Sequence, residues 1–413
     1  MKNEFAKMDA GKLHQANKKM LLKLIKQEGQ VSRSELARIT GLTPPSITRF
    51  VEELAEKDNL VELLGTGNSS GGRPPMMVRF KNEGNYIIGI DLGATSIRGC
   101  LVDLNARFLS EIQIPTEINK GFDSILHKVK QLIHKLQNRV EPESKIWGIG
   151  MGVAGLVNTT TGVIEHSPDF GWSDVDLRKE MVNDLDIPFF YDNSTRLMAL
   201  GELYFNSSRG LKNFAVINMG YGIAAGLVIE GNLVRGDKGF AGEFGHINVD
   251  SASTVKCHCG YYGCLEALAS GHRIAERGKE EMARNNTGFL KDLCQGKPEL
   301  ITAELVANAA RLGDQVCVDI YEEITDYLCK GIGILSRLFN PELVYLGGGI
   351  TENGPFFFEM IHKKLKNYLF RPNSNLQILS TTYSEQATAI GAVSLVLEKI
   401  MSLELTIPVQ NTA

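Results

Sequence analysis

Two widely separated stretches of the chain repeat one pattern: an apolar run, a tight glycine-containing turn and a second apolar run. The first is YIIGIDLGATSIRGCLVDL, from Tyr86, and the second is FAVINMGYGIAAGLVIEGNLV, from Phe214. A late glycine turn, LVYLGGGI at 343–350, follows both. Each stretch predicts two strands joined by a turn whose backbone amides can approach a phosphate. Sheets are therefore a required part of the fold, and the helical patterns around them indicate the α/β class.

The first 81 residues differ in charge from the rest of the chain. They contain 14 Lys and Arg against 9 Asp and Glu, a net charge of +5. The remaining residues of the 413 contain 30 against 39, a net charge of −9. A basic segment joined to an acidic body is typical of a protein that binds a polyanion through one module.

Helical patterns in the basic segment predict a helix-turn-helix. Apolar residues recur at helical spacing over 12–28. A short helix follows in SRSELARITGL, with Ser32 or Ser34 as its N-cap, and a third begins in TPPSITRFVEELAEK. Two strands, near 60–64 and in MMVRF, are joined by the glycine-rich tip GTGNSSGGRPP and make this a winged variant.

The outward face of the third helix offers contacts to DNA. Short or bidentate donors at the start of a recognition helix reach base edges in the major groove. An arginine in the wing would lie over a phosphate or in a minor groove. The alternative, a three-helix packing or dimerisation module, does not account for the charge. The candidate DNA-binding residues are Ser46, Thr48, Arg49 and Arg73.

Closely spaced cysteines predict a metal site in the acidic body. Cys257, Cys259 and Cys264 lie in CHCGYYGC, shortly after His246 at the end of GEFGH. Three thiolates and one imidazole can form a tetrahedral Cys3His zinc site with a structural role. His258 is the competing imidazole, but a residue between two ligand cysteines more often points outward, which favours His246. The four other cysteines are scattered, as expected for core thiols in a reducing compartment.

The chain is long enough for two or three domains. Its longest apolar runs fall well short of the roughly 20 residues that a membrane span needs. The N-terminus is polar and does not have the pattern of a signal sequence. We therefore expect a cytoplasmic protein without membrane insertion.

Taken together, these motifs resemble those of the ROK family (repressor, open reading frame, kinase), from the first helix to about Ile400. The resemblance implies an α/β protein in which a winged helix-turn-helix precedes a two-lobed, actin-like sugar-kinase fold. The N-terminal winged helix is similar to the repressor branch, which includes the xylose and N-acetylglucosamine repressors. The motifs that carry the resemblance are IDLGAT, GVAGLVN at 152–158, PDFGW at 168–172, GEFGH at 242–246, CHCGYYGCLE at 257–266 and QATAIGA at 386–392.

The resemblance also implies a division of the chain into three domains. Residues 1–81 would form the DNA-binding domain and 82–195 the first α/β lobe. Residues 196–385 would form the second lobe, which carries the zinc site. A C-terminal helix at about 386–402 would return to the first lobe.

Sugar contacts are implied for particular residues. PDFGW matches a sugar-contacting loop that usually reads Asn-Leu-Gly-Trp, and the change of Asn to Asp169 removes a donor and adds charge. Carboxylates and amides of this kind form hydrogen bonds to vicinal hydroxyls. Zinc would hold His246 and the loop that bears Glu266 in place. The implied sugar-binding residues are Asp169, Asn193, Glu243, His246 and Glu266.

The stretch FYDNSTR departs from the kinase pattern at one position. In the kinases, the Asn equivalent to Asn193 is followed by an Asp that acts as general base on the sugar hydroxyl. Here that position is Ser194, and a serine is a poor proton acceptor near neutral pH. Asp192 would point to the other side of the strand. We therefore expect no catalytic residue.

A second departure lies in NMGYGIAAG, which occupies the place of a kinase phosphate loop that usually reads Gly-Thr-Gly. Tyr221 replaces the small threonine. Ala224 and Ala225 would add methyl groups where the backbone approaches a phosphate. Both changes act against ATP turnover.

The sequence therefore predicts a sugar-responsive transcriptional repressor of carbohydrate-metabolism genes, such as those for xylose, without kinase activity. Its partners would be operator DNA, a monosaccharide or sugar-phosphate effector and a second copy of the chain, with tetramers left open. The first alternative is an ATP-dependent sugar kinase with a regulatory DNA-binding head. The second is a sensor whose body docks on a sugar-transport protein.

Overall fold

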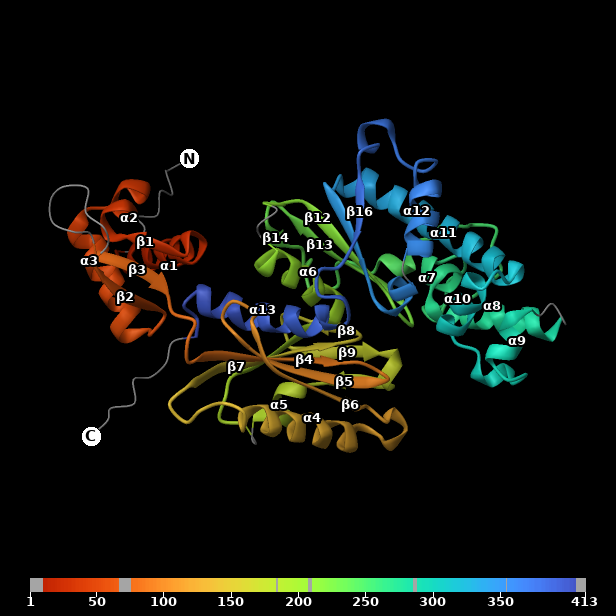
Figure 1. Cartoon of the computed structure of the whole chain (residues 1–413), viewed down its shortest axis with the longest axis horizontal. Helices are drawn as coiled ribbons and strands as arrows, with labels where there is room; N and C mark the ends of the chain where they lie inside the picture. Colours follow the sequence, from red (N-terminus) through yellow and green to blue (C-terminus); the bar gives the residue numbers. More distant parts are fainter. Residues whose placement is uncertain are drawn as a thin grey trace, which may run out of the picture.

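The structure divides into an N-terminal domain, here called the head, and two α/β lobes (Figure 1). It is a computed structural model. The C-terminal helix α13 (Ala387–Met401) runs along the first lobe and reaches the head (Figure 1). No helix in the described part of the chain is both long and apolar enough to cross a bilayer. The residues that the structure describes are 10–66, 76–182, 185–206, 210–284, 288–353 and 355–405.

The head is a winged helix-turn-helix, as the sequence predicts. Ser32 rather than Ser34 caps α2, because its Oγ accepts the N–H of Glu35 at 3.1 Å. The sheet has the order β1-β3-β2 and thus one strand more than predicted, since β1 pairs antiparallel with β3. The elements are α1 (Ala10–Glu28), β1 (Gln30–Ser32), α2 (Arg33–Thr40), α3 (Pro44–Glu52), the π-helical turn η1 (Glu53–Lys57), β2 (Val61–Thr66) and β3 (Met76–Phe80).

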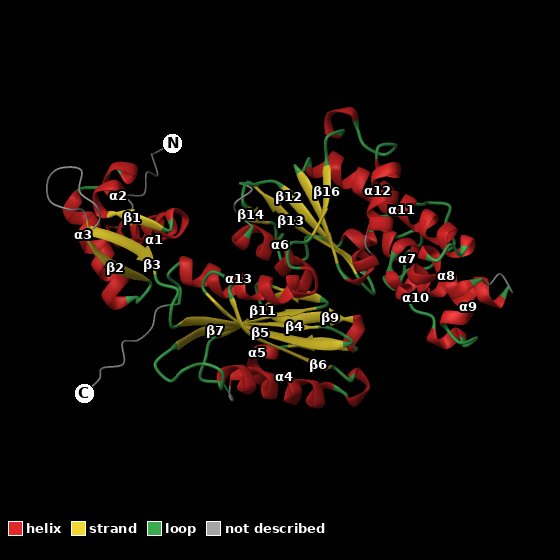
Figure 2. Ribbon diagram, viewed as in Figure 1, coloured by secondary structure: helices red, strands yellow, loops and turns green. Residues whose placement is uncertain are grey.

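The first lobe is built on a five-stranded sheet with the order β11-β7-β4-β5-β6. Helix α13 lies on one face of this sheet, and α4 and α5 lie on the other (Figure 2). Because both faces are covered, β4 and β7 are apolar almost throughout. The elements are β4 (Asn85–Leu92), β5 (Ser96–Asp103), β6 (Phe108–Pro115), α4 (Phe122–Gln137), β7 (Lys145–Val153), β8 (Leu156–Asn158), β9 (Val163–Ser167), the 3-10 turn η3 (Pro168–Phe170), β10 (Trp172–Val175), α5 (Leu177–Val182) and β11 (Phe189–Asn193).

The second lobe repeats this topology. Its sheet has the order β14-β13-β12-β15-β16, with an antiparallel hairpin followed by parallel strands, as in the first lobe. The two strand–turn–strand units that the sequence predicts are the antiparallel hairpins β4–β5 and β12–β13. The elements are β12 (Phe214–Met219), β13 (Ile223–Ile229), β14 (Asn232–Leu233), the 3-10 turn η5 (Phe244–His246), α7 (Leu265–Ala269), α8 (Gly271–Ala283), α9 (Phe289–Leu293), α10 (Ala303–Arg311), α11 (Gln315–Phe339), β15 (Leu343–Gly347), α12 (Pro355–Leu365) and β16 (Gln377–Ser380).

Helices α6 (Ser194–Phe205) and α13 pack against each other between the two sheets. Their backbones come so close that a Cβ on Gly391 would lie 1.9 Å from the carbonyl oxygen of Leu197. Only glycine permits this contact. A shift of α6 would therefore be transmitted to α13.

Helix α13 also connects the body to the head. One apolar cluster contains Leu21 of α1, Phe80 of β3, and Val396 and Ile400 of α13. Next to it, Lys26 donates hydrogen bonds to the carbonyl oxygen of Leu104 at 2.9 Å and to Asn105 Oδ1 at 3.0 Å. The head is thus packed on the body and not merely tethered to it.

Candidate functional site

A cavity of about 590 Å³ lies between the two lobes. Its wall contains residues from the end of β11, from η3, from the β12–β13 turn, from η5 and from α7 and α8. This volume falls within the range of about 300–1,000 Å³ that is usual for small-molecule sites. All five residues with implied sugar contacts line it: Asp169, Asn193, Glu243, His246 and Glu266.

Asn193 forms the N-terminal cap of α6. Its Oδ1 accepts the backbone N–H groups of Thr195 at 3.0 Å and Arg196 at 3.1 Å. Its Nδ2 donates to the carbonyl oxygen of Gly155 at 2.9 Å. Most of the hydrogen-bonding capacity of this side chain is therefore used to start the helix, and one N–H of the amide remains for a ligand.

Glu266 connects α7 to the β12–β13 turn. Its Oε2 accepts the backbone N–H of Ile223 at 2.9 Å. A Cβ on Gly222 would lie only 2.4 Å from the same oxygen, so a side chain there would displace the carboxylate. The glycine that follows Tyr221 thus allows Glu266 to lie beside the turn.

The cavity is rich in carboxylates. Burial raises the pKa of Asp169, and the nearby charge of Glu266 adds to the rise, while His258 opposes it. Burial also raises the pKa of Glu243, against the opposing effects of His246 and Arg196, and Glu266 again adds to the rise. Hydroxyl groups that donate to these acceptors would relieve part of this cost.

The side chains of Asp192 and Ser194 differ in what they face. Asp192 is buried, and its Oδ1 accepts the N–H of Asn193 at 2.7 Å and Arg196 Nε at 2.9 Å. Ser194 lines the cavity, whereas Asp192 is not part of its wall. The position directly after Asn193 therefore contributes a serine, and not a carboxylate, to the cavity wall.

The β12–β13 turn carries the second predicted departure, and one detail of that prediction is wrong. Tyr221 is 57 % exposed and lines the cavity, as does Ala224. Ala225 is 2 % exposed and packs in the core of the second lobe. Successive side chains on a strand point to opposite faces, so only one of the two methyl groups can reach the cavity.

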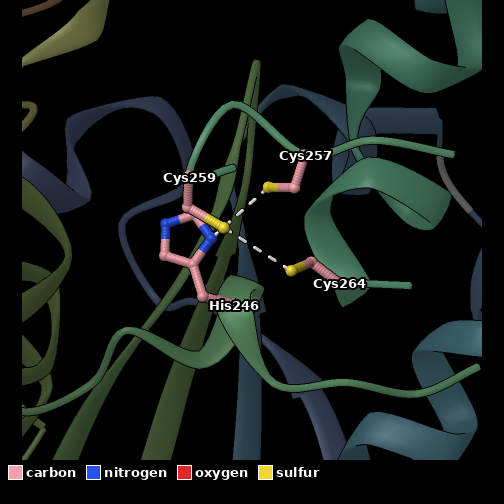
Figure 3. A group of neighbouring side chains, drawn as sticks. All are labelled: His246, Cys257, Cys259 and Cys264. Carbon is pink, nitrogen blue, oxygen red and sulfur yellow. Dashed lines mark hydrogen bonds between the residues drawn. The ribbon is translucent and has the colours of Figure 1, made fainter. Parts of the chain in front are cut away.

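The three cysteines and His246 form one compact cluster (Figure 3). Their ligand atoms all lie within 4.8 Å of one another. Cys257 Sγ is 3.6 Å from His246 Nδ1, and Cys259 Sγ is 3.6 Å from Cys264 Sγ. Tetrahedral zinc, with ligand bonds of about 2.0–2.3 Å, places its ligand atoms roughly 3.3–3.8 Å apart. The donor set fits such an ion, and the competing His258 is outside the cluster.

The loop that carries the cysteines is held by short-range pairing. Bridges join Asn248 to Cys264 and Lys256 to Tyr262. Gly263 has a φ of 70°, and a Cβ there would lie 2.0 Å from the carbonyl oxygen of Asp250. The glycine is therefore required by the turn that brings Cys264 back to the cluster.

The predicted DNA contacts lie on the outer part of α3. Arg49 is exposed, with its guanidinium 5.3 Å from the centre of the Phe50 ring. Ser46 and Thr48 are half-buried, and the Ser46 hydroxyl forms a 2.9 Å hydrogen bond with Thr43 Oγ1. Arg73 and the wing tip lie outside the described residues.

Sequence reasoning missed Arg196, which is 1 % exposed. Its guanidinium donates to Asp192, to the carbonyl oxygen of Val157 at 3.1 Å and to that of Gly239. The spacing of four residues between an acid and an arginine was a usable signal in DNSTR. Basic and imidazole residues in the cavity wall were also missed, because only the fold brings them there: Lys256, His272 and Arg273.

Known proteins have similar sequences and structures over nearly the whole chain. The xylose repressor of Caldicellulosiruptor bescii is 28 % identical over 392 residues, which cover 94 % of this chain and 97 % of that protein. A crystal structure of a ROK family transcriptional regulator, a homologue of the E. coli MLC protein, has a TM-score of 0.81 and 26 % identity, and covers 95 % of this chain and 98 % of the other.

The body alone is also similar to enzymes. A ROK family glucokinase from Streptomyces griseus, in complex with glucose and AMPPNP, has a TM-score of 0.68 and 28 % identity. The match covers 75 % of this chain and 98 % of the glucokinase. Residues 15–58 match the family description "winged helix-turn-helix DNA-binding". Residues 87–399, more than half of the chain, match the description "ROK family". The chain therefore belongs to the ROK family.

Proposed function

We propose that this protein is a sugar-responsive transcriptional repressor of carbohydrate-metabolism genes, without kinase activity. The observation that carries the proposal is the combination, in one chain, of a winged helix-turn-helix head with a ROK body whose cleft presents Ser194 beside Asn193. Xylose genes are one candidate target, because the similar Caldicellulosiruptor protein is a xylose repressor. The protein acts in the cytoplasm on operator DNA, as a homodimer that two-fold operators require.

Each of the three domains has its own role in this function. Residues 1–81 bind DNA, with Ser46, Thr48, Arg49 and Arg73 at the interface. Residues 82–195, together with the C-terminal helix, and residues 196–385 form the two lobes around the effector. The cluster of His246 and the cysteines holds a structural zinc ion, which orders the loops at the sugar site.

The packing suggests how ligand binding in the cavity affects the head. The cavity wall contains residues from both lobes, so a bound sugar favours one lobe arrangement over another. Helix α6 starts at the cavity and packs closely on α13, and α13 shares an apolar cluster with the head. A change in the lobe arrangement therefore alters the spacing of paired heads on an operator.

Operator binding should respond to sugar in the absence of phosphate transfer. The probe is an operator selected by the wild-type protein from random duplex DNA, with binding followed by fluorescence anisotropy. At least one saccharide should change the affinity by about tenfold, a coupling of about 1.4 kcal/mol. Asn193→Ser should remove this response, because serine keeps a capping oxygen for α6 but lacks the amide donor.

In the same preparations, ATP and magnesium should produce no sugar phosphate above background. Ser194→Asp alone should restore little, since a base accelerates nothing without a positioned phosphoryl group. Turnover near 1 per second or faster, within the ordinary enzyme range of about 1–10³ per second, would establish the kinase alternative instead.

Arg49→Ala should weaken operator binding by about 1–3 kcal/mol and relax base preference, because a bidentate base contact is lost. Sugar binding should stay unchanged, since α3 lies in the head, well apart from α7 and α8, which contribute to the cavity wall (Figure 1). The matched control is Arg284→Ala, an exposed arginine at the end of α8 in the second lobe. Equal operator affinities for wild type, Arg49→Ala and the control would rule out α3 as the DNA reader.

A further inference from the structure

A row of three aromatic rings, two of them on exposed residues, lines part of the cavity. The Tyr221 and His272 rings are 5.0 Å apart between centroids, and the His272 and His258 rings are 5.8 Å apart. The interplanar angles are 40° and 46°. All three side chains belong to the wall of the same cavity as the sugar-binding candidates.

Backbone contacts join the segments that carry Tyr221 and His272. The N–H of Gly271 donates to the carbonyl oxygen of Gly220 at 3.0 Å, and the N–H of His272 to that of Tyr221 at 3.4 Å. The start of α8 is thus fastened to the β12–β13 turn. The Tyr221 and His272 rings therefore lie side by side, and Tyr221 is 57 % exposed, so its ring is accessible to a ligand.

This surface adjoins the inner carboxylates. Ile223, two residues after Tyr221, donates its backbone N–H to Glu266 at 2.9 Å, and His258 and Asp169 line the same cavity. A ligand held by Asp169 and Glu266 would therefore extend over the rings if it continued in their direction. A single pyranose ring is smaller than the ligands that usually fill cavities of about 300–1,000 Å³.

Charge argues against a phosphate as the extending group. The described wall contains four carboxylates, Asp169, Glu243, Glu266 and Glu276, and two basic side chains, Lys256 and Arg273. Arg273 is bonded to Glu280 at 2.9 Å, and Glu276 is bonded to Lys279 at 2.9 Å, so these two side chains add little to the balance and Asp169, Glu243 and Glu266 face Lys256. A dianionic group brought into this net acidic, partly buried cavity would be repelled. The apolar faces of a second sugar ring carry no such cost and can pack on aromatic side chains.

We propose that the effector is an uncharged saccharide of at least two rings, with one ring at the inner carboxylates and the next on the Tyr221–His272–His258 surface. The proposal rests on the proposed function and specifies its ligand class. It assigns to Tyr221 a positive role in binding, at the place where the kinases hold nucleotide phosphates.

Calorimetry on the full chain tests it with glucose, xylose, glucose 6-phosphate, cellobiose, maltose and xylobiose. At least one disaccharide should bind about tenfold tighter than the monosaccharide it contains. Tyr221→Ala should lower that disaccharide affinity by about tenfold and monosaccharide affinity by less than about twofold. Tyr221→Phe should keep the affinity of the wild type, and Phe370→Ala, which removes an exposed ring elsewhere, should change nothing.

Tightest binding of glucose 6-phosphate, the absence of any gain from a second ring, or an equal effect of Tyr221→Ala on both ligand sizes would overturn the inference. If a monosaccharide or its phosphate still shifts operator affinity, the repressor function stands and only the ligand class is wrong. If no saccharide binds or shifts operator affinity, both proposals fail.

Discussion

Replacing Cys264 with serine is expected to remove bound metal and to destabilise the second lobe by about 3 kcal/mol or more, the range reached when a structural metal is lost. Cys264 is 1 % exposed and pairs with Cys259 in the cluster, so the serine would leave a poor ligand inside an otherwise intact donor set. Wild-type protein should contain about one zinc ion per chain. Elemental analysis and thermal unfolding, with and without a chelator, measure both effects.

The sugar response should disappear together with the metal. His246 contributes to the cluster and to the cavity wall, and the cysteine loop leads directly into α7, which bears Glu266. The matched control is Cys329→Ala, a fully buried thiol outside the cluster, which should cost only a small packing defect and leave the zinc content unchanged. Freshly prepared, unchelated protein without zinc, or an unchanged melting temperature in Cys264→Ser, would contradict the assignment.

Local patterns predicted the architecture well. Glycine turns between apolar runs indicated β4–β5 and β12–β13, and helical spacing with capping residues indicated α1, α2 and α3. The cysteine spacing indicated the cluster, because ligands close in sequence are forced to be close in space. Strand β1 was missed, since three residues are too few to show a period.

Long-range contacts could not be predicted in the same way. The hydrogen bond between Glu266 and the N–H of Ile223 joins elements that are distant in sequence, and so does the ring row of Tyr221, His272 and His258. The wrong expectation for Ala225 has a related origin. The turn was recognised, but the face to which each strand residue points depends on register, which only the paired sheet defines.

Replacing Arg196 with methionine is expected to destabilise the protein by about 3–5 kcal/mol, the usual cost of breaking a buried ion pair. Methionine preserves apolar volume but leaves the Asp192 carboxylate buried, and among the described residues Arg235, at 3.8 Å, is then its one cationic partner. It also removes donors from the carbonyl oxygens of Val157 and Gly239, which belong to the β8 strand and to the loop after β14.

The position of Arg196 explains why function should be lost along with stability. The residue lies in the first turn of α6, three residues after the Asn193 cap, and donates to carbonyl oxygens of both lobes. Arg235→Met is the matched control: this partly exposed arginine contacts Asp192 and Glu398, and its loss should cost about 1 kcal/mol or less. Asp192→Asn combined with Arg196→Met should recover part of the loss, because no unpaired charge stays buried. Denaturant unfolding measures the stability of each variant, and operator affinity with and without sugar measures its response. A loss in Arg196→Met no greater than in the control would mean that the buried ion pair contributes little to stability.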